Sequence, residues 1–176
     1  LITQNDDSSK TSYLGCLHIF CTGLSFSIKF QLTSDSIKQQ GDFLLVDSQV
    51  IQIASLTVNG AKKDLANLSV SEQKQLLSDY SKYEMDYFSN DQKIEVINPE
   101  NQWVSIKSKH WLIWYFRVWN LPIQVEGKTA IQLFASTIIG DKILDLNAPI
   151  QQDGNFGKAA LIVNQMMESL IIDPKN

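Results

Sequence analysis

Two cysteines and a histidine near the start of the chain are residue types that bind zinc. Cys16, His18 and Cys21 lie close together in the sequence, and a zinc site needs three or four such ligands. On a β-strand, positions 16 and 18 share a face while position 21 points to the opposite one, so only a bulge would bring all three together. We therefore expect two small buried thiols and a strand histidine rather than a metal site. The same geometry argues against a disulfide between Cys16 and Cys21, unless the hairpin begins earlier than the pattern indicates.

Nucleophilic chemistry has few residues to work with. The histidines of the chain are His18 and His110, and there is no G-x-S-x-G motif, so a Ser/His/Asp or Cys/His site would have to use one of them. His110 stands beside Lys109 at the start of an aromatic segment and is typical of a strand edge. The phosphate-binding motifs G-x-x-x-x-G-K-S/T and G-x-G-x-x-G are absent from the sequence. We therefore predict no enzyme activity and no cofactor.

Glu84 is the carboxylate whose surroundings could change its chemistry. It shares a predicted helix face with Tyr80 and Tyr87, and burial on that face would raise its pKa. No partner is evident in the sequence, so we expect a helix-flank acid that pairs with a nearby lysine. Catalysis would require Glu84 or His110 in a cleft, with a second polar group within hydrogen-bond reach.

Aromatic residues are the most prominent feature of the chain. They gather in the segment HWLIWYFRVW (110–119) and at helical spacing between residues 80 and 87. Such a set can form plain core, a surface for a protein partner or a pocket for an apolar ligand. Our candidate binding residues are Trp111, Trp114, Tyr115, Trp119, Tyr80 and Tyr83.

Composition limits the classes of function. The chain has 176 residues, 44% of them hydrophobic, and a formal net charge of -4. Its single arginine is Arg117, and its lysines are scattered, so there is no basic patch to bind nucleic acid. No apolar run is long enough to span a membrane. We expect one globular domain over residues 13–172, between a polar tail at 1–12 and a short tail at 173–176.

The polar tail also bears on location. Residues 1–12 lack periodicity, and such a segment often follows a removed signal peptide. We therefore expect a periplasmic or secreted protein, while a cytoplasmic location stays open.

Alternating hydrophobicity predicts strands in the first part of the chain. Residues 14–32 form a hairpin interrupted at Thr22-Gly23, and residues 43–46 and 50–58 form a second hairpin around Asp47-Ser48. A helix should then run from about 70 to 89. Its start is marked by the capping box of Ser69 and Glu72.

The period returns to two after this helix. IEVI (94–97) and QWVSI (102–106) flank a predicted turn at 98–101. Residues 110–119 are apolar on both faces, which is typical of a strand with a layer packed on each side. Along this strand, Trp114 and Phe116 point one way, and Tyr115 and Arg117 the other.

The last part of the chain predicts a hairpin and a helix. Strands at about 128–139 and 142–148 flank Gly140-Asp141, where glycine supplies the positive φ of the first turn position. An apolar stripe then predicts a helix at about 156–171. The element order gives an α+β fold with a mostly antiparallel sheet flanked by amphipathic helices, either an α/β/α sandwich or two layers.

This order resembles the PsbP-like superfamily, which includes the DcrB-like bacterial envelope proteins. The likeness covers roughly residues 24–172 and rests on the helix SVSEQKQLLSDYSKYEMDYF, the hairpin TAIQLFASTIIGDKILDLNAPI and the closing helix FGKAALIVNQMMESL. It implies an antiparallel sheet between helices and a non-enzymatic accessory, adaptor or assembly role, often in an exported protein. No functional residue carries over, because the family has no shared catalytic set.

We therefore predict a non-catalytic binding or adaptor domain of a bacterial envelope or secreted protein, which acts as a monomer or dimer on an unknown protein partner. This function predicts an exposed apolar groove or sheet face. The alternative is a carrier of a small apolar ligand, with a closed aromatic cavity between the sheet and the helix at 70–89.

Overall fold

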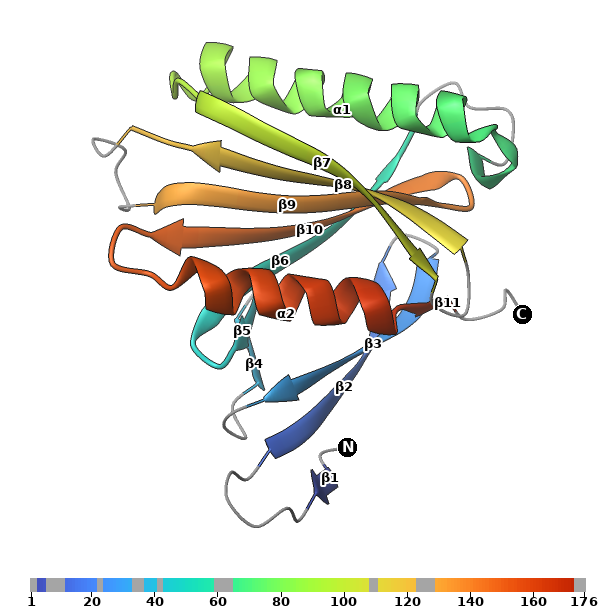
Figure 1. The fold of residues 1–176 in the computed structure, drawn as a ribbon, viewed down its shortest axis with the longest axis vertical. Coiled ribbons are helices and arrows are strands. Elements are labelled where there is room, and N and C mark those ends of the chain that lie inside the picture. Colours follow the sequence, from blue (N-terminus) through green and yellow to red (C-terminus); the bar gives the residue numbers. More distant parts are fainter. Residues whose placement is uncertain are drawn as a thin grey trace.

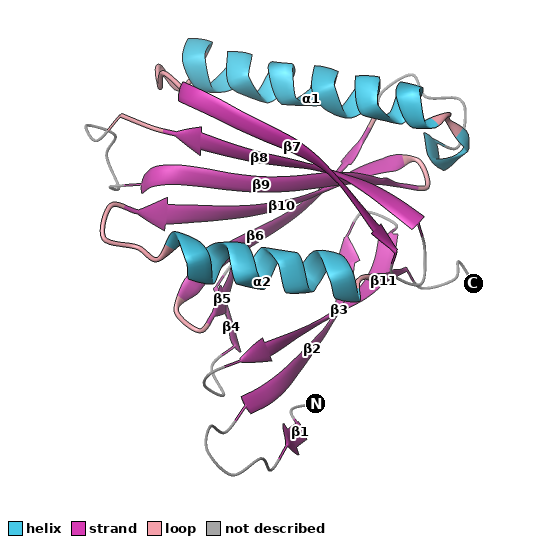
Figure 2. Ribbon diagram, viewed as in Figure 1, coloured by secondary structure: helices cyan, strands magenta, loops and turns pink. Residues whose placement is uncertain are grey.

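The computed structural model describes residues 3–5, 12–21, 24–32, 37–40, 43–58, 65–107, 111–122 and 129–172. Within these residues the chain folds into two antiparallel sheets and two long helices, shown in Figure 1 along the chain and in Figure 2 by type of element. The elements are β1 (Thr3–Asn5), β2 (Ser12–Cys21), β3 (Leu24–Leu32), β4 (Ile37–Gln40), β5 (Phe43–Val46), β6 (Gln49–Thr57), the 3-10 turn η1 (Leu65–Asn67), α1 (Val70–Asn90), β7 (Ile97–Lys107), β8 (Trp111–Asn120), β9 (Thr129–Ile139), β10 (Lys142–Gln151), α2 (Phe156–Ser169) and β11 (Ile171–Ile172).

The larger sheet has the strand order β4-β5-β6-β10-β9-β8-β7, and the smaller sheet has the order β1-β2-β3-β11. The pairings between neighbours in both sheets are antiparallel. The predicted α+β class, with a mostly antiparallel sheet flanked by helices, is therefore confirmed.

The two helices cover opposite faces of the larger sheet. Trp114 of β8 belongs to a core cluster that contains the buried stripe of α2, whereas Tyr115 belongs to a second cluster that contains Leu77 of α1. Because successive side chains of a strand point to opposite faces, α1 and α2 lie on opposite sides. The prediction that β8 is covered on both faces is confirmed. The smaller sheet packs on the α2 side, where Phe26 and Ile28 join the first cluster.

Both helices begin at the residues that their capping chemistry favours. The Ser69 side chain accepts from the backbone N–H of Glu72, and the Glu72 carboxylate accepts from the N–H of Ser69 at 2.8 Å. This is the predicted capping box. At α2, Asn155 accepts from the backbone N–H of Lys158 at 3.0 Å.

Two of the predicted hairpin turns are confirmed by their backbone angles. Asp47 and Ser48 have φ of 47° and 68° between β5 and β6, and Gly140 has φ of 61° between β9 and β10. The β2–β3 hairpin is also present, although Thr22 and Gly23 lie outside the described residues.

The turn predicted at 98–101 is wrong. These residues lie inside β7, and the register with β8 shifts between Ile97 and Glu100. The shift is a bulge, with Asn98 at a φ of 45°, so the turn-forming residues bend one strand instead of joining two. Residues 94–96 of the predicted strand are not in a strand.

Three short strands were not predicted. β4 lies in a polar stretch between the two predicted hairpins, and β1 lies within the segment predicted as a polar tail. The closing helix ends at Ser169 instead of 171, and the next two residues form β11, which pairs with Ser27 and Phe26 of β3. β1 and β11 have three and two residues, too few to show alternation, and β4 is a four-residue strand of mostly polar residues. No helix in the described part of the chain is long and apolar enough to cross a membrane.

The Ser69 cap gives a prediction about stability. Ser69→Ala removes the acceptor for an orphan N–H at the start of α1, so we expect the free energy of unfolding to fall by about 1 kcal/mol. Urea unfolding at neutral pH measures it. Ser89→Ala, at an exposed position in the last turn of the same helix, is the control and should change it by less than about 0.5 kcal/mol. Equal effects of the two substitutions would contradict a capping role.

Candidate functional site

A cleft of about 380 Å³ lies between α1 and the face of the larger sheet that α1 covers. Its helix side is lined by Tyr80, Tyr83, Glu84, Tyr87 and Phe88, and its sheet side by Gln52, Ala54, Leu56, Gln132, Phe134, Asp145 and Asn147. The helix residues recur at spacings of three and four and so share one face of α1. The sheet residues alternate along β6, β9 and β10 and so share one face of the sheet.

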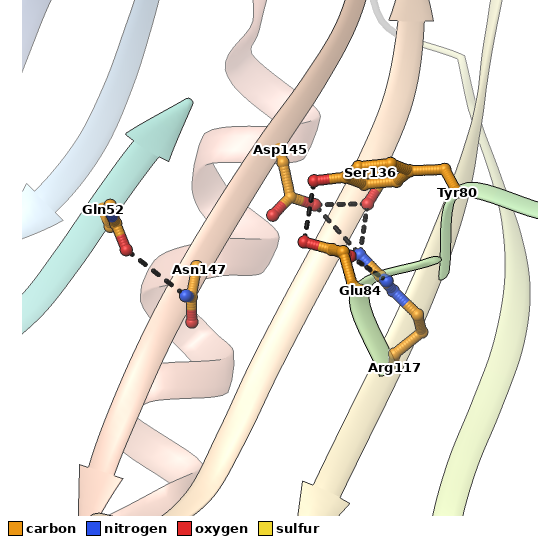
Figure 3. Close-up of polar contacts among 7 residues, drawn as sticks. All are labelled: Gln52, Tyr80, Glu84, Arg117, Ser136, Asp145 and Asn147. Atoms are coloured by element: carbon orange, nitrogen blue, oxygen red, sulfur yellow. Dashed lines mark hydrogen bonds and ion pairs between the residues drawn. The ribbon is translucent and has the colours of Figure 1, made fainter. Parts of the chain in front are cut away.

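A buried ionic cluster adjoins this cleft (Figure 3). The Arg117 guanidinium donates from Nη1 to Glu84 Oε2 at 2.5 Å, and from Nη2 to Ser136 Oγ at 2.6 Å and Asp145 Oδ1 at 3.1 Å. Ser136 Oγ in turn donates to Asp145 Oδ1. The Tyr80 hydroxyl donates to the second Glu84 oxygen, Oε1, at 2.7 Å.

The register of the sheet places the three strand residues of this cluster. Ser136 of β9 is the direct cross-strand partner of both Tyr115 on β8 and Asp145 on β10. Arg117 lies two residues beyond Tyr115 and therefore on the same face. Glu84 and Tyr80 reach this face from α1, so the cluster joins one helix to three neighbouring strands.

Arg117 is 1% exposed, and a charge this deeply buried must be compensated. Two carboxylates provide most of the compensation, through charge-assisted hydrogen bonds. Aromatic faces add to it, because the guanidinium carbon lies 4.7 Å from the ring centre of Phe134 and 5.5 Å from that of Trp119. The ring centres of Tyr80 and Tyr115 lie 5.6 and 5.7 Å from the same guanidinium carbon.

The buried Asp145 carboxyl is harder to ionise than an exposed one. Burial raises the pKa of Asp145 to about 7, with the Glu84 charge acting in the same direction and the Arg117 charge and hydrogen bonds opposing it. Burial also raises the pKa of Tyr80 far above its usual value of 10.0, with the Asp145 and Glu84 charges adding to the effect. Tyr80 is therefore a neutral hydroxyl donor, while Asp145 changes its charge near neutral pH.

Three side-chain amides line the sheet side of the cleft. Asn147 Nδ2 donates to Gln52 Oε1 at a long 3.4 Å, and Figure 3 shows this pair on neighbouring strands beside the ionic cluster. Asn147 Oδ1 and Gln132 Oε1 are buried atoms with no hydrogen-bond partner among the described residues. Both residues line the cleft, although these two oxygens are themselves buried, and unpaired buried polar atoms are costly.

The candidate binding residues separate into two groups. Tyr80 and Tyr83 line the cleft, and Tyr83 is 69% exposed. Trp114, Tyr115 and Trp119 are buried in the two core clusters or beside them and line neither the cleft nor the groove described below. The side chain of Trp111 lies outside the described residues. A binding role for these strand residues stays a prediction.

Two of the buried strand aromatics support the cleft indirectly. Trp119 packs against Phe88 and Phe134, both of which line the cleft. The Trp119 ring centre lies 5.5 Å from that of Phe88 and 4.6 Å from that of Phe134. Tyr115 stacks on Trp103 at 4.2 Å. These contacts fix the rings that form the cleft wall and the ring faces around Arg117.

The prediction that Glu84 pairs with a nearby lysine is wrong. The carboxylate pairs with Arg117 from β8 instead of a nearby lysine. Arg117, Ser136 and Asp145 were not predicted as site residues. A signal for Arg117 was present, because it is the single arginine of the chain and stands among aromatic residues on the predicted buried strand. Nothing comparable marked Ser136 or Asp145.

The residues considered for metal binding do not form a cluster within the described residues. His18 is exposed, and its Nδ1 lies 2.8 Å from Ser27 Oγ. Cys16 is a half-buried free thiol, while the Cys21 side chain and all of His110 lie outside the described residues. No group of three or more His, Cys, Asp or Glu side chains converges in the described part of the chain.

A second depression lies on the opposite face of the sheet, between α2 and β7–β8. This groove is about 820 Å³ in volume and is lined by Gln102, Val104, Ser105, Ile106, Phe116, Phe156, Ala160, Asn164 and Glu168. It combines apolar side chains with a polar rim.

The chain was compared with family models, curated proteins and solved structures. No family model matches the chain, and no curated protein is significantly similar to it. Among solved structures, the chain is similar to the solution structure of cyanobacterial PsbP (CyanoP) from Synechocystis sp. PCC 6803, with a TM-score of 0.46 and 10% identity over 98% of this chain and 92% of that chain. These values are too low to establish a family or a function.

The ionic cluster predicts a large effect of removing its cation. Arg117→Met leaves Glu84 and Asp145 without their counter-charge, so we expect the free energy of unfolding at pH 8 to fall by about 3–5 kcal/mol. Urea unfolding measures it. The control is Lys82→Met, which breaks an exposed pair with Asp79 and should cost at most about 1 kcal/mol. Similar losses in both variants would show that Arg117 is not in a dry ionic cluster.

The raised pKa of Asp145 predicts how stability depends on pH. The native state holds this proton up to about pH 7, whereas the unfolded chain releases it near its ordinary pKa of about 3.9. The stabilisation is therefore present below that ordinary value and is lost as pH rises through about 7. We expect Asp145→Asn to flatten the fall in unfolding free energy between pH 5 and 8, as measured by urea unfolding. Ser89→Ala, which changes no titratable group, should leave the slope unchanged; a wild-type slope in the Asp145 variant would refute the assignment.

Proposed function

We propose that this chain is a non-catalytic binding domain whose ligand is a small molecule in the cleft between α1 and the larger sheet. The lining of the cleft carries this proposal, because aromatic rings from α1 and β9 face carboxyl and amide groups from α1, β6, β9 and β10. Small-molecule sites typically combine apolar walls with a few convergent polar groups, in volumes from about 300 Å³ upward.

The cleft differs from the closed aromatic cavity of the carrier hypothesis. Carboxyl and amide groups form part of its wall, among them Glu84, Asp145 and Asn147. A purely apolar ligand would leave without a partner the Asp145 oxygen that points away from the ionic cluster, which is unfavourable. The lining instead favours a ligand with an apolar body and a polar end.

The bonding of the polar groups supports a binding role over a catalytic one. Glu84 does meet the condition stated for catalysis, since it lines a cleft within hydrogen-bond reach of Tyr80 and Arg117. However, each of its oxygens already accepts a hydrogen bond, and Ser136 Oγ is engaged with both Arg117 and Asp145. A general base or nucleophile needs a lone pair directed at the substrate. These groups are instead held by each other.

An adaptor role is the second candidate function, and the groove on the α2 side favours it. Val104, Ile106, Phe116 and Phe156 give this groove the apolar floor that a protein partner would cover. The location in a bacterial envelope or as a secreted protein rests on the polar segment at 1–12 and on the family resemblance, and forms part of the proposal.

A fragment screen by ligand-observed NMR tests both functions. Ala54→Phe fills the α1 cleft, and Ser105→Phe, at an exposed residue of the α2 groove, is the matched control. We expect fragments with an apolar body and a polar end to bind wild type and Ser105→Phe but not Ala54→Phe.

Circular dichroism and thermal unfolding show whether each variant is folded, and Ala54→Ile is a milder substitute if Phe is not tolerated. Binding lost in Ser105→Phe alone would assign the function to the α2 groove. Native mass spectrometry before and after denaturation adds an independent test, since a co-purified ligand appears as mass that is lost on unfolding. Fragment binding unaffected by either substitution would overturn the proposal.

A further inference from the structure

The charged side chains among the described residues that line the α1 cleft are both acidic. They are Glu84 and Asp145, and the described lining includes no lysine, arginine or histidine. Asp145 is 3% exposed and still contributes to the cleft wall. In Figure 3, one of its oxygens points toward Ser136 and Arg117, while the other points away from them. The cleft therefore presents carboxylate oxygens to whatever occupies it.

Arg117 does not cancel this negative character. Its two terminal nitrogens are both used within the cluster, by Glu84 on one side and by Ser136 and Asp145 on the other. With Asp145 ionised, two carboxylates and one guanidinium leave the cluster with a net charge of about -1. A second positive charge would complete the compensation, and the surrounding low dielectric would strengthen that interaction.

The aromatic lining of the cleft also favours a positively charged ligand. Tyr80, Tyr83 and Tyr87 present three phenol rings from α1, and Phe88 and Phe134 add two further rings to the lining. The faces of such rings carry negative electrostatic potential and attract ammonium groups. Arg117 already lies 4.7 Å from the ring centre of Phe134, so this region of the molecule does accommodate a cation against aromatic faces.

The unpaired amide oxygens favour a donor as well. Gln132 Oε1 and Asn147 Oδ1 are buried acceptors without a partner among the described residues. An amide can turn to present nitrogen instead, so these groups alone do not fix the sign of the ligand charge. The carboxylates do fix it, because they can only accept when ionised.

We propose that the cleft binds a small organic cation, an ammonium group carried on an apolar, preferably aromatic, body. The ammonium group lies against Asp145 and the amide oxygens, and the apolar body packs between the α1 tyrosines and Phe134. This inference rests on the proposed function and names the chemical class of its ligand.

Binding of a cation should be coupled to the loss of the proton on Asp145. The groups that face Asp145 are Arg117 from β8, Ser136 from β9, and Glu84 with Tyr80 from α1; its neighbour on β6 is Ala54, which carries no charge. Because Asp145 is half protonated at about pH 7, a bound cation favours its ionised form and displaces the proton. Affinity for a permanent cation should therefore rise severalfold between pH 6 and pH 8.

Three probes of similar size and different charge test the inference: 2-phenylethylammonium, which stays charged at both pH values used, 2-phenylethanol and 3-phenylpropanoate. Each is titrated into the ¹⁵N-labelled protein at pH 6 and pH 8, and the dissociation constant is taken from the amide shifts of α1, β9 and β10. We expect the cation to bind about tenfold more tightly than the alcohol at pH 8. The anion should bind most weakly.

Variants separate the charge effect from general fit. We expect Asp145→Asn to remove the pH dependence of cation binding, while Glu168→Gln, which removes an acid from the α2 groove, keeps it. Ala54→Phe should abolish the shifts in α1, β9 and β10. Cleft binding of the alcohol or the anion as tight as that of the cation would overturn the inference and leave the proposed function standing. No cleft shifts with any of the three probes would overturn the inference together with its premise.

Discussion

The burial of one positive charge, on Arg117, is the constraint on which this face of the molecule depends. A guanidinium that is 1% exposed cannot stay in the interior without carboxylates. Its two carboxylates come from elements far apart in sequence, Glu84 on α1 and Asp145 on β10. The ionic cluster therefore fixes where α1 lies on the sheet and which strand faces it. Ser136 of β9 lies opposite Asp145 of β10 on one side and Tyr115 of β8 on the other. If one of these strands slipped by one residue, its side chains in the cluster would turn to the other face of the sheet.

The same cluster explains why α1 leaves a cleft. In its first half, α1 and the turn before it pack tightly on the sheet through Leu65, Leu77, Tyr115, Ile138 and Ile143. In its second half, the helix residues that line the cleft are three tyrosines, Glu84 and Phe88, and the strands beneath offer amides and a carboxyl. Polar groups of this kind cannot be packed as closely as aliphatic ones without losing hydrogen bonds. One helix therefore closes the core at one end and borders a cleft at the other.

The sequence predicted most of this framework, because periodicity is a local property. The helix at 70–89, the two-faced strand HWLIWYFRVW and the Gly140 turn all follow from side-chain spacing and backbone preference. The smaller sheet did not follow, since β1 and β11 are two or three residues long and exist through pairing with β2 and β3. The Asn98-Pro99 pair was read as a turn, although bulges and turns use the same residues. Tyr80, Tyr83 and Glu84 were recognised from α1 alone, whereas Ser136 and Asp145 depend on strand register, which local patterns do not reveal.

The two faces of the larger sheet also differ in what explains them. On the α2 side, buried aliphatic residues and the methionine pair 166–167 form a continuous apolar core, and burial of apolar surface accounts for it. The α1 side has a smaller apolar cluster around Leu77, Ile138 and Ile143, and beside it the charged residues of the ionic cluster, which burial of apolar surface does not explain. Replacing a buried ion pair by well-packed apolar residues is commonly neutral or stabilising, so Arg117, Glu84 and Asp145 are poorly explained as devices for stability. Aliphatic residues at these positions, like those on the α2 side, would satisfy the fold and fill the cleft. What the ionic cluster provides instead is a carboxyl whose pKa burial raises to about 7, on the wall of a cleft, as the proposed binding role requires.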